Sequence, residues 1–216
     1  MCQFIETIRI EDGKAVNLAF HNYRFNKTRR DVFECNLPVN LADYIQPGDY
    51  SGRTKCRVEY QEEVEKVEYL PYTVRPVNRL RLVTSDGLDY TYKSADRQKL
   101  DELFRQKGEA DDILIIRDGV LTDTSIANIA LWNGSQWETP EVPLLEGTMR
   151  ASLLGKGRIV PAVIRPQDLS RYSLVRLFNA MIGFGEIEFP VENIIYVING
   201  IADTCLIYFV VVHERT

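Results

Sequence analysis

The side chains that could take part in chemistry gather around one lysine in the middle of the chain. Lys93 ends a short predicted strand and precedes a helix for which Ser94 and Asp96 are N-cap candidates. The strands predicted next along the chain carry three polar side chains, Asp123, Ser125 and Asn128. A lysine at the end of a strand is usually a solvated charge. Its surroundings, rather than its residue type, therefore make Lys93 a candidate for a functional amine.

Two other kinds of site are poorly supported by the sequence. The chain has two histidines, His21 and His213, and neither lies near a cysteine or a second histidine, so no metal site is expected. No G-x-S-x-G segment is present, which argues against a Ser-His-Asp hydrolase. The four cysteines are scattered and form no C-x-x-C pair, so we interpret them as free thiols. They are Cys2, Cys35, Cys56 and Cys205.

The composition is that of an ordinary globular protein. The chain has 216 residues, of which 45% are hydrophobic and 26% charged, enough apolar material for one large domain or two small ones. The net charge of −5 argues against a surface that binds nucleic acid. The first ten residues have no apolar signal-peptide core, and the longest apolar run, 205–212, is far shorter than the roughly 20 residues of a membrane helix. We therefore expect a cytoplasmic protein.

The first part of the chain predicts an N-terminal lobe with both strands and helices. Apolar alternation on both sides of Asp12-Gly13 predicts a hairpin that reaches Phe20, followed by a helix over 23–33 and a short helix around 41–45. Residues 56–70 alternate apolar and charged with one phase slip, which predicts one strand with a bulge. The predicted lobe ends at residue 87, after a strand over 80–83 and the Asp86-Gly87 turn.

The second part of the chain is richer in strands. Leu100, Leu103 and Phe104 share one helical face, and a β-meander is expected over 113–139. Thr148 is expected to cap a helix that extends to Leu154. Further strands are predicted over 158–164, 174–178, 194–198 and 205–212. The fold class is thus α+β, with a smaller N-terminal α/β lobe over 1–87 and a strand-rich C-terminal lobe over 88–216.

Four segments, in one order along the chain, resemble the class IV aminotransferases, which are fold-type-IV pyridoxal-phosphate enzymes. The first combines Phe4–Arg9 (FIETIR), similar to F-E-T-[IL]-R, with His21–Phe25 (HNYRF), similar to H-L-x-R-L. The second is Tyr92-Lys93, in the position of the cofactor-binding lysine. The third, 112–129, resembles D-x-[IV]-L…T-E-x-[ST]-x-x-N-[IL]. The fourth, 143–150 (PLLEGTMR), resembles P-x-L-x-G-[IVT]-x-R.

The resemblance implies a two-lobed enzyme that binds pyridoxal 5′-phosphate, and it gives individual residues a role. Lys93 would bond to the cofactor's aldehyde and later move a proton. Asp123 would lie beside the ring nitrogen, although the family usually has Glu there, one methylene longer. The 5′-phosphate would be held by an arginine, a helix start and a second turn. These residues are Arg24, Thr148 and Met149, and Asn179, Ala180 and Met181.

Within the family, two details favour the branch of the 4-amino-4-deoxychorismate lyases. Lys93–Arg97 (KSADR) resembles the lyase pattern K-x-x-[ND]-R, and Phe178–Met181 (FNAM) is similar to T-N-[AS]-[LM]. Such a lyase forms 4-aminobenzoate, a folate precursor, and pyruvate. Its substrate has two carboxylates, which require cationic partners in the pocket. Arg75 and Arg81, as well as Arg29 and Arg30, are available for this.

Two alternatives remain open at this point. The chain could be a class IV aminotransferase that acts on D- or branched-chain amino acids, because D-amino-acid enzymes share part of the second pattern. It could also be a non-catalytic relative that binds a synthase partner, since Asp123 and the short N-terminal lobe depart from the family pattern. The resemblance further implies a homodimer, and it suggests the chorismate-aminating synthase as a possible partner.

Overall fold

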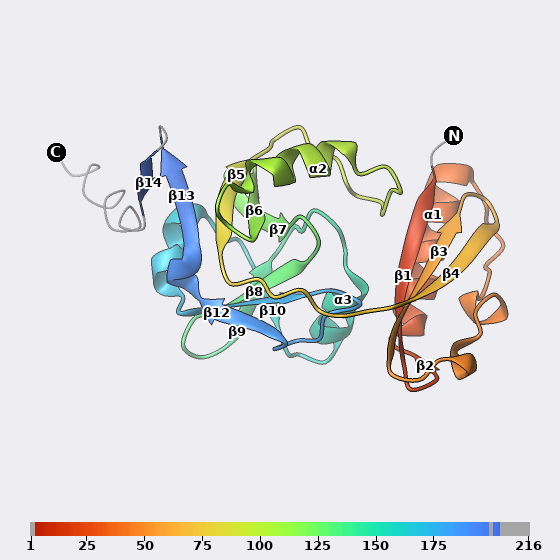
Figure 1. Ribbon diagram of the computed structural model, residues 1–216. Helices are drawn as coiled ribbons and strands as arrows, with labels where there is room; N and C mark the ends of the chain where they lie inside the picture. The colour runs from red at the N-terminus through yellow and green to blue at the C-terminus, as the bar shows by residue number, and fades with distance from the viewer. Residues whose placement is uncertain (1–2, 199–200, 204–216) are drawn as a thin grey trace.

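The computed structural model describes residues 3–198 and 201–203. Two bodies of secondary structure lie side by side and are joined by the extended segment 72–79, as Figure 1 shows. One body contains a single sheet, and the other contains two sheets of five strands each. The predicted α+β class with two lobes is therefore confirmed.

The N-terminal lobe is an antiparallel sheet covered by one helix. Its strands lie in the order β2-β1-β3-β4. Phe25, on the helix, is fully buried against the sheet, and its ring centroid lies 4.5 Å from that of Tyr60. The elements are β1 (Phe4–Glu11), β2 (Lys14–Ala15), α1 (Leu18–Phe33), β3 (Arg53–Tyr60) and β4 (Val64–Pro71), with 3₁₀ turns at Leu41–Asp43 and Pro47–Asp49.

Two sequence predictions in this lobe are wrong. The hairpin at Asp12-Gly13 forms, but its second strand ends at Ala15 because Asn17 adopts a left-handed conformation (φ 56°) and Leu18 already begins α1. The single bulged strand predicted over 56–70 is a hairpin instead. Its phase slip marks the reversal at 61–63 between β3 and β4, and of the two strands only β3 has a strict alternation of buried residues.

The C-terminal lobe packs its two sheets against each other. The first has the order β14-β13-β5-β6-β7 and the second β10-β9-β8-β11-β12. Buried side chains of both sheets, such as Leu82, Leu114, Ile129 and Leu177, form one apolar cluster. The first sheet comprises β5 (Leu80–Thr84), β6 (Asp112–Arg117), β7 (Val120–Thr124), β13 (Ile194–Ile198) and β14 (Ile201–Asp203). The second comprises β8 (Asn128–Trp132), β9 (Trp137–Pro140), β10 (Val160–Ala162), β11 (Leu174–Phe178) and β12 (Ile187–Pro190).

Two helices and three 3₁₀ turns complete this lobe: α2 (Gln98–Phe104), α3 (Thr148–Gly155), Arg105–Lys107, Pro166–Arg171 and Val191–Asn193. In the described part of the chain, no helix combines the length and the apolar character that crossing a membrane requires. Cys35 and Cys56 are free thiols. The strand expected over 205–212, like Cys2 and Cys205, lies outside the described residues.

The strand pairing moves the division between the lobes to an earlier point than residue 87. β5 pairs in parallel with β6 and β13, so residues 80–84 belong with the C-terminal sheets. The chain therefore changes lobes between Pro71 and Leu80. A sequence boundary placed at the Asp86-Gly87 turn misses this, because a short apolar strand does not indicate which sheet it joins.

The segment that carries Lys93 is a loop and not the end of a strand. It lies along the beginning of β1, where the N–H of Ile5 donates to the carbonyl of Lys93 (2.9 Å) and the N–H of Ala95 donates to the carbonyl of Gln3 (2.8 Å). These two bonds fix a C-terminal-lobe loop to the N-terminal sheet.

Replacement of Leu114 tests the core between the two sheets. Leu114 is fully buried, so Leu114→Ala is expected to lower the free energy of unfolding by about 2–5 kcal/mol through lost burial and a cavity. Urea denaturation measures this. Leu37→Ala is the control, because Leu37 is 81% exposed and its loss should change stability by less than about 0.5 kcal/mol. Equal effects of the two variants would contradict the described core.

Candidate active site

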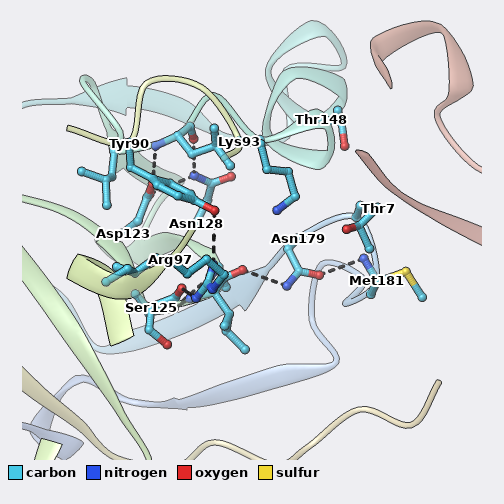
Figure 2. A pocket seen from close by; sticks show the side chains of 18 of the residues that line it. Thr7, Tyr90, Lys93, Arg97, Asp123, Ser125, Asn128, Thr148, Asn179 and Met181 are labelled. Atoms are coloured by element: carbon cyan, nitrogen blue, oxygen red, sulfur yellow. Dashed lines mark hydrogen bonds between the residues drawn. The ribbon is translucent and has the colours of Figure 1, made fainter. Parts of the chain in front are cut away.

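A pocket opens where the two lobes meet. Its wall takes Thr7 from β1, Arg24 from α1, Lys55 from β3 and Tyr72 from the joining segment 72–79. The remaining residues come from the C-terminal lobe and the Lys93 loop. Figure 2 shows the Lys93 side chain extending into the space framed by Asn128, Asn179 and Thr148. The polar side chains that line the pocket from the C-terminal lobe are Tyr90, Arg97, Asp123, Thr124, Ser125, Asn128, Thr148 and Asn179.

Lys93 presents an amine with unusual acid–base properties. Among the described residues, its Nζ has no hydrogen-bond or ion-pair partner. Loss of water around the ammonium group, followed by repulsion from Arg24, lowers the pKa of Lys93 to about 7, although Glu6 acts in the opposite direction. The amine is therefore neutral in a large fraction of molecules at physiological pH, and a neutral amine is a nucleophile.

Asp123 offers a buried carboxylate at the end of β7. One oxygen accepts from the Asn128 side-chain amide (2.8 Å) and the other from the backbone N–H of Leu145 (2.9 Å). Burial raises the pKa of Asp123 to about 6, and these two hydrogen bonds limit the rise. The carboxylate is thus mostly ionised at pH 7 and held in a fixed orientation.

Asn128 and Gly147 approach each other so closely that only glycine fits. A Cβ at Gly147 would lie 2.0 Å from Oδ1 of Asn128. Asn128 is itself fixed, because its amide donates to Asp123 and to the carbonyl of Leu145 (3.0 Å). The glycine therefore allows the segment that begins α3 to pack against the residue that orients Asp123.

The beginning of α3 faces the pocket through Gly147 and Thr148. The backbone N–H groups of Thr148 and Met149 have no hydrogen-bond partner within residues 3–198. Free N–H groups and the helix dipole favour a negative charge at this position. Thr148 is the first helical residue, and Gly147 is the N-cap, so the expected side-chain cap by Thr148 does not form.

A buried ion-pair network supports this part of the wall. The Glu6 carboxylate accepts two hydrogen bonds from Arg24 (2.8 and 2.7 Å) and one from Nδ1 of His21 (2.6 Å). Burial alone would raise the pKa of Glu6, but Arg24 and His21 outweigh it and lower that pKa to about 2. Arg24 also donates to the carbonyl of Glu146 (3.3 Å), directly before α3.

The turn after β11 lines the pocket with Asn179, Ala180 and Met181. The Oδ1 of Asn179 accepts from the N–H groups of Met181 (2.8 Å) and Ile182 (2.9 Å), and its amide donates to the carbonyl of Ile126 (3.0 Å). The Met181 N–H is therefore already engaged. Ala180 is the residue of this turn whose backbone N–H has no partner in the described chain.

The structure gathers most of the predicted site residues in one place. Arg24, Lys93, Asp123, Thr148, Asn179, Ala180 and Met181 all line the pocket. Met149 does not. Its side chain is buried in an apolar cluster with Leu153 and Phe178, so its backbone N–H is the part available to a ligand.

The predicted substrate arginines lie elsewhere. Arg75 is exposed and packs over the Phe104 ring, at 5.8 Å from the centroid. Arg81 lies beside Gly108. Arg29 donates to the carbonyls of Glu62 and Leu37, and Arg30 is exposed. None of the four lines the pocket, because the positions that hold them, on α1, the linker and β5, face other parts of the molecule or solvent.

Several pocket residues have no predicted role. Arg97 and Asn128 lie within segments that resemble the family, so a motif signal for them exists. Lys55 and Tyr72 have none. The alternation along β3 indicates that Lys55 lies on a polar sheet face without indicating what covers it, and Tyr72 lies in the joining segment, outside any motif. Within residues 3–198 and 201–203, no group of three His, Cys, Asp or Glu side chains is arranged to hold a metal ion.

The arrangement suits a ligand with an electrophilic carbon and an anionic group. A partly neutral amine, a fixed carboxylate, an arginine and the beginning of a helix converge on one pocket. The amine can bond covalently to an aldehyde, and the helix start can bind an anion.

Gly147→Ala tests the close approach to Asn128. The added Cβ would displace the Asn128 amide from Asp123 and Leu145, so we expect the free energy of unfolding to fall by about 1–3 kcal/mol. Thermal and urea denaturation measure this. Gly155→Ala is the matched control at the other end of α3, since no atom lies within 4 Å of the position that its Cβ would occupy. A variant at Gly147 as stable as the control would contradict the packing.

The reactivity of Lys93 is expected to follow its lowered pKa. With a pKa of about 7, the neutral fraction rises from about one tenth at pH 6 to about nine tenths at pH 8. Reductive methylation with formaldehyde and cyanoborohydride, quantified by peptide mass spectrometry, should therefore reach half of its maximal rate near pH 7. The exposed Lys156 is the internal reference. Parallel pH profiles for the two lysines would contradict the assignment.

Comparison with known proteins identifies the family. Residues 60–188 match the model of the amino-transferase class IV family. An uncharacterized protein of Haemophilus influenzae is 33% identical over 187 residues, which cover 85% of this chain and 100% of the relative. A crystal structure from Haemophilus somnus, of a candidate 4-amino-4-deoxychorismate lyase, is 36% identical and has a TM-score of 0.77 over 85% of this chain and 98% of that chain.

A more distant structure has the same fold. The PLP-bound form of a hypothetical aminotransferase from Mycobacterium tuberculosis has a TM-score of 0.69 at 16% identity, covering 89% of this chain and 81% of the other. The motif resemblance in the sequence is thus confirmed by family, relative and fold together. The chain belongs to the class IV aminotransferase family.

Proposed function

We propose that this protein is a 4-amino-4-deoxychorismate lyase that uses pyridoxal 5′-phosphate to form 4-aminobenzoate and pyruvate. The observation that carries the proposal is the Lys93 amine, without a partner in the described chain and with a pKa lowered to about 7, in a pocket that also holds Asp123 and the start of α3. The 36% identity to a candidate lyase supports the choice of reaction.

The residues of the pocket fit the cofactor. Lys93 would hold its aldehyde carbon, Asp123 its ring nitrogen, and Thr148, Ala180 and Arg24 its phosphate. When bound, pyridoxal phosphate supplies an electron sink for the substrate's bonds. Asp123 is shorter than the usual Glu, and the hydrogen bonds from Asn128 and Leu145 hold its carboxylate in place with a negative charge.

The chain's own groups would move the proton. With the cofactor and substrate bound, Nζ of Lys93 would accept a proton from the adjacent substrate carbon and return it later. A pKa of about 7 suits both the acceptance and the return of the proton, because the amine gains and loses a proton with little free-energy change near neutral pH.

Two cations in the pocket support a substrate with two carboxylates. Arg97 is held by the carbonyl of Ser125 (2.8 Å) and the hydroxyl of Tyr90 (3.3 Å), and it lines the pocket beside Lys93. Lys55 reaches the pocket from β3, in the other lobe. Arg97 and Lys55 therefore take the place of Arg75 and Arg81 as proposed substrate ligands.

Product analysis distinguishes the lyase from its alternatives. We expect the purified protein with pyridoxal phosphate to form 4-aminobenzoate from 4-amino-4-deoxychorismate without an added keto acid. Amino transfer that depends on a keto acid would instead favour an aminotransferase for D- or branched-chain amino acids. Cofactor binding with neither activity, even after addition of a chorismate-aminating synthase, would favour a non-catalytic partner protein.

Lys93→Ala should lose the borohydride-reducible adduct in all cases. Light scattering tests the proposed homodimer.

Replacement of the two pocket cations tests substrate recognition. Arg97→Met and Lys55→Met each remove a cationic partner of a substrate carboxylate. A hydrogen bond between charged groups contributes about 1.5–3 kcal/mol, so each substitution should lower kcat/KM by about 10- to 150-fold. Cofactor binding, followed by absorbance, should change little. Arg75→Met is the matched control, since Arg75 lies outside the pocket. A loss for Arg75→Met as large as for Arg97→Met would contradict the assignment.

A further inference from the structure

A chain of three buried side chains connects the N-terminal sheet to the beginning of α3. Oε2 of Glu6 lies 2.6 Å from Nδ1 of His21, and Nε2 of His21 lies 3.2 Å from the Thr148 hydroxyl. Glu6 and His21 are fully buried, and Thr148 is 3% exposed and lines the pocket. The three residues come from β1, α1 and α3, so the chain crosses between the lobes.

The hydrogen bonds indicate which atoms of these three side chains carry a proton. Glu6 is ionised and can only accept, so Nδ1 of His21 must carry a hydrogen. Burial lowers the pKa of His21, although Glu6 opposes the change, so the ring is neutral and Nε2 carries a lone pair. The Thr148 hydroxyl therefore donates its single hydrogen to Nε2, and it presents lone pairs to the pocket.

In this protonation state the Thr148 hydroxyl cannot donate to a bound phosphate, because its single hydrogen points to His21. The second pKa of a phosphate group is about 6, so its oxygens mostly accept hydrogen bonds at neutral pH. For Thr148 to donate to a phosphate oxygen, its hydroxyl must turn, and its oxygen must then accept from His21. That requires a hydrogen on Nε2 as well as on Nδ1. We propose that His21 takes up one proton from solvent when a phosphate group binds beside Thr148, so that the site binds phosphate and a proton together. The inference rests on the proposed function in taking this phosphate to be the cofactor's.

The charges around His21 support the uptake of a proton on phosphate binding. Glu6 on β1 favours the protonated ring, whereas Arg24 on α1 and Lys93 in the pocket loop disfavour it. On α3, Arg150 points away from the pocket and donates to the carbonyl of Pro140 (2.8 Å). Burial is the largest cause of the lowered pKa of His21, and repulsion from Arg24 and Lys93 adds to it. A phosphate near Arg24 and Lys93 offsets their positive charge and so removes this repulsion.

Imidazole NMR tests the proposal directly. The chain has two histidines, and a His21→Gln variant identifies the His21 signals. At pH 7.5 the apoprotein should show neutral His21. Saturating pyridoxal 5′-phosphate should shift the signals to those of imidazolium, whereas pyridoxal, which lacks the phosphate, should not. The same His21 state with both compounds, whether neutral or charged, would overturn the inference.

The pH dependence of cofactor affinity gives a second test. Above neutral pH, the affinity of the wild type for the cofactor should fall more steeply than that of His21→Gln, by up to about tenfold per pH unit. The glutamine amide always donates to Thr148 and takes up no proton, so the variant lacks this contribution. Thr148→Ser should retain the steeper slope, and Thr148→Val should lose it. This pair remains informative if His21→Gln fails to fold. Equal slopes for Ser and Val would overturn the inference.

Failure of the proposed function would be recognised separately. If neither pyridoxal 5′-phosphate nor pyridoxal forms a reducible adduct with Lys93, the lyase proposal fails. Inorganic phosphate then serves as the probe. Protonation of His21 on saturation with inorganic phosphate would still support the proton-linked site. A neutral His21 under those conditions, or no phosphate binding, would overturn it.

Discussion

The arrangement of the site depends on one buried negative charge, the carboxylate of Glu6. A carboxylate without water is stable only if donors surround it, and Arg24 and His21 provide three hydrogen bonds. Both partners lie on α1, so this charge and the packing of Phe25 together fix the helix on the sheet. The same two residues then bond to Glu146 and Thr148. A single side chain of β1 thus positions the two residues of α1 that contact the beginning of α3.

The electrostatics of the pocket serve two purposes at once. Burial, together with the positive charges of Arg24 and Arg97, favours the neutral form of Lys93. Lys55 adds a further positive charge to the wall of the same pocket. The same positive field attracts anionic ligands. Asp123 keeps its charge because two donors hold it despite burial. A reactive amine and an anion-binding pocket are therefore consequences of one charge distribution.

The sequence predicts those elements that depend on local signals. The Asp12-Gly13 turn, the strands β6 to β9 and helix α3 lie where expected, because turn residues and periodicity determine them. The predictions fail where one residue's conformation decides, as at Asn17, or where a reversal lacks turn residues, as at 61–63. The sheet that β5 joins also depends on distant strands.

The same distinction between local signals and tertiary contacts applies to the residues of the site. Lys93, Asp123 and Thr148 belong to ordered motifs, so the resemblance finds them. Lys55 lies on a strand whose polar face looks like any solvated face, and only the other lobe makes it part of a pocket. Arg75 and Arg81 have the right charge, but their location relative to the pocket depends on tertiary contacts that no local pattern encodes.

The pocket lies between two lobes that share one stretch of backbone, residues 72–79 (Figure 1). Its wall combines Thr7, Arg24 and Lys55 of one lobe with residues of the other. A molecule bound there would touch both and act as a non-covalent crosslink. Its release and any rotation of the lobes about residues 72–79 would then be a single kinetic event, so residence time would report on domain motion as much as on contacts within the cavity.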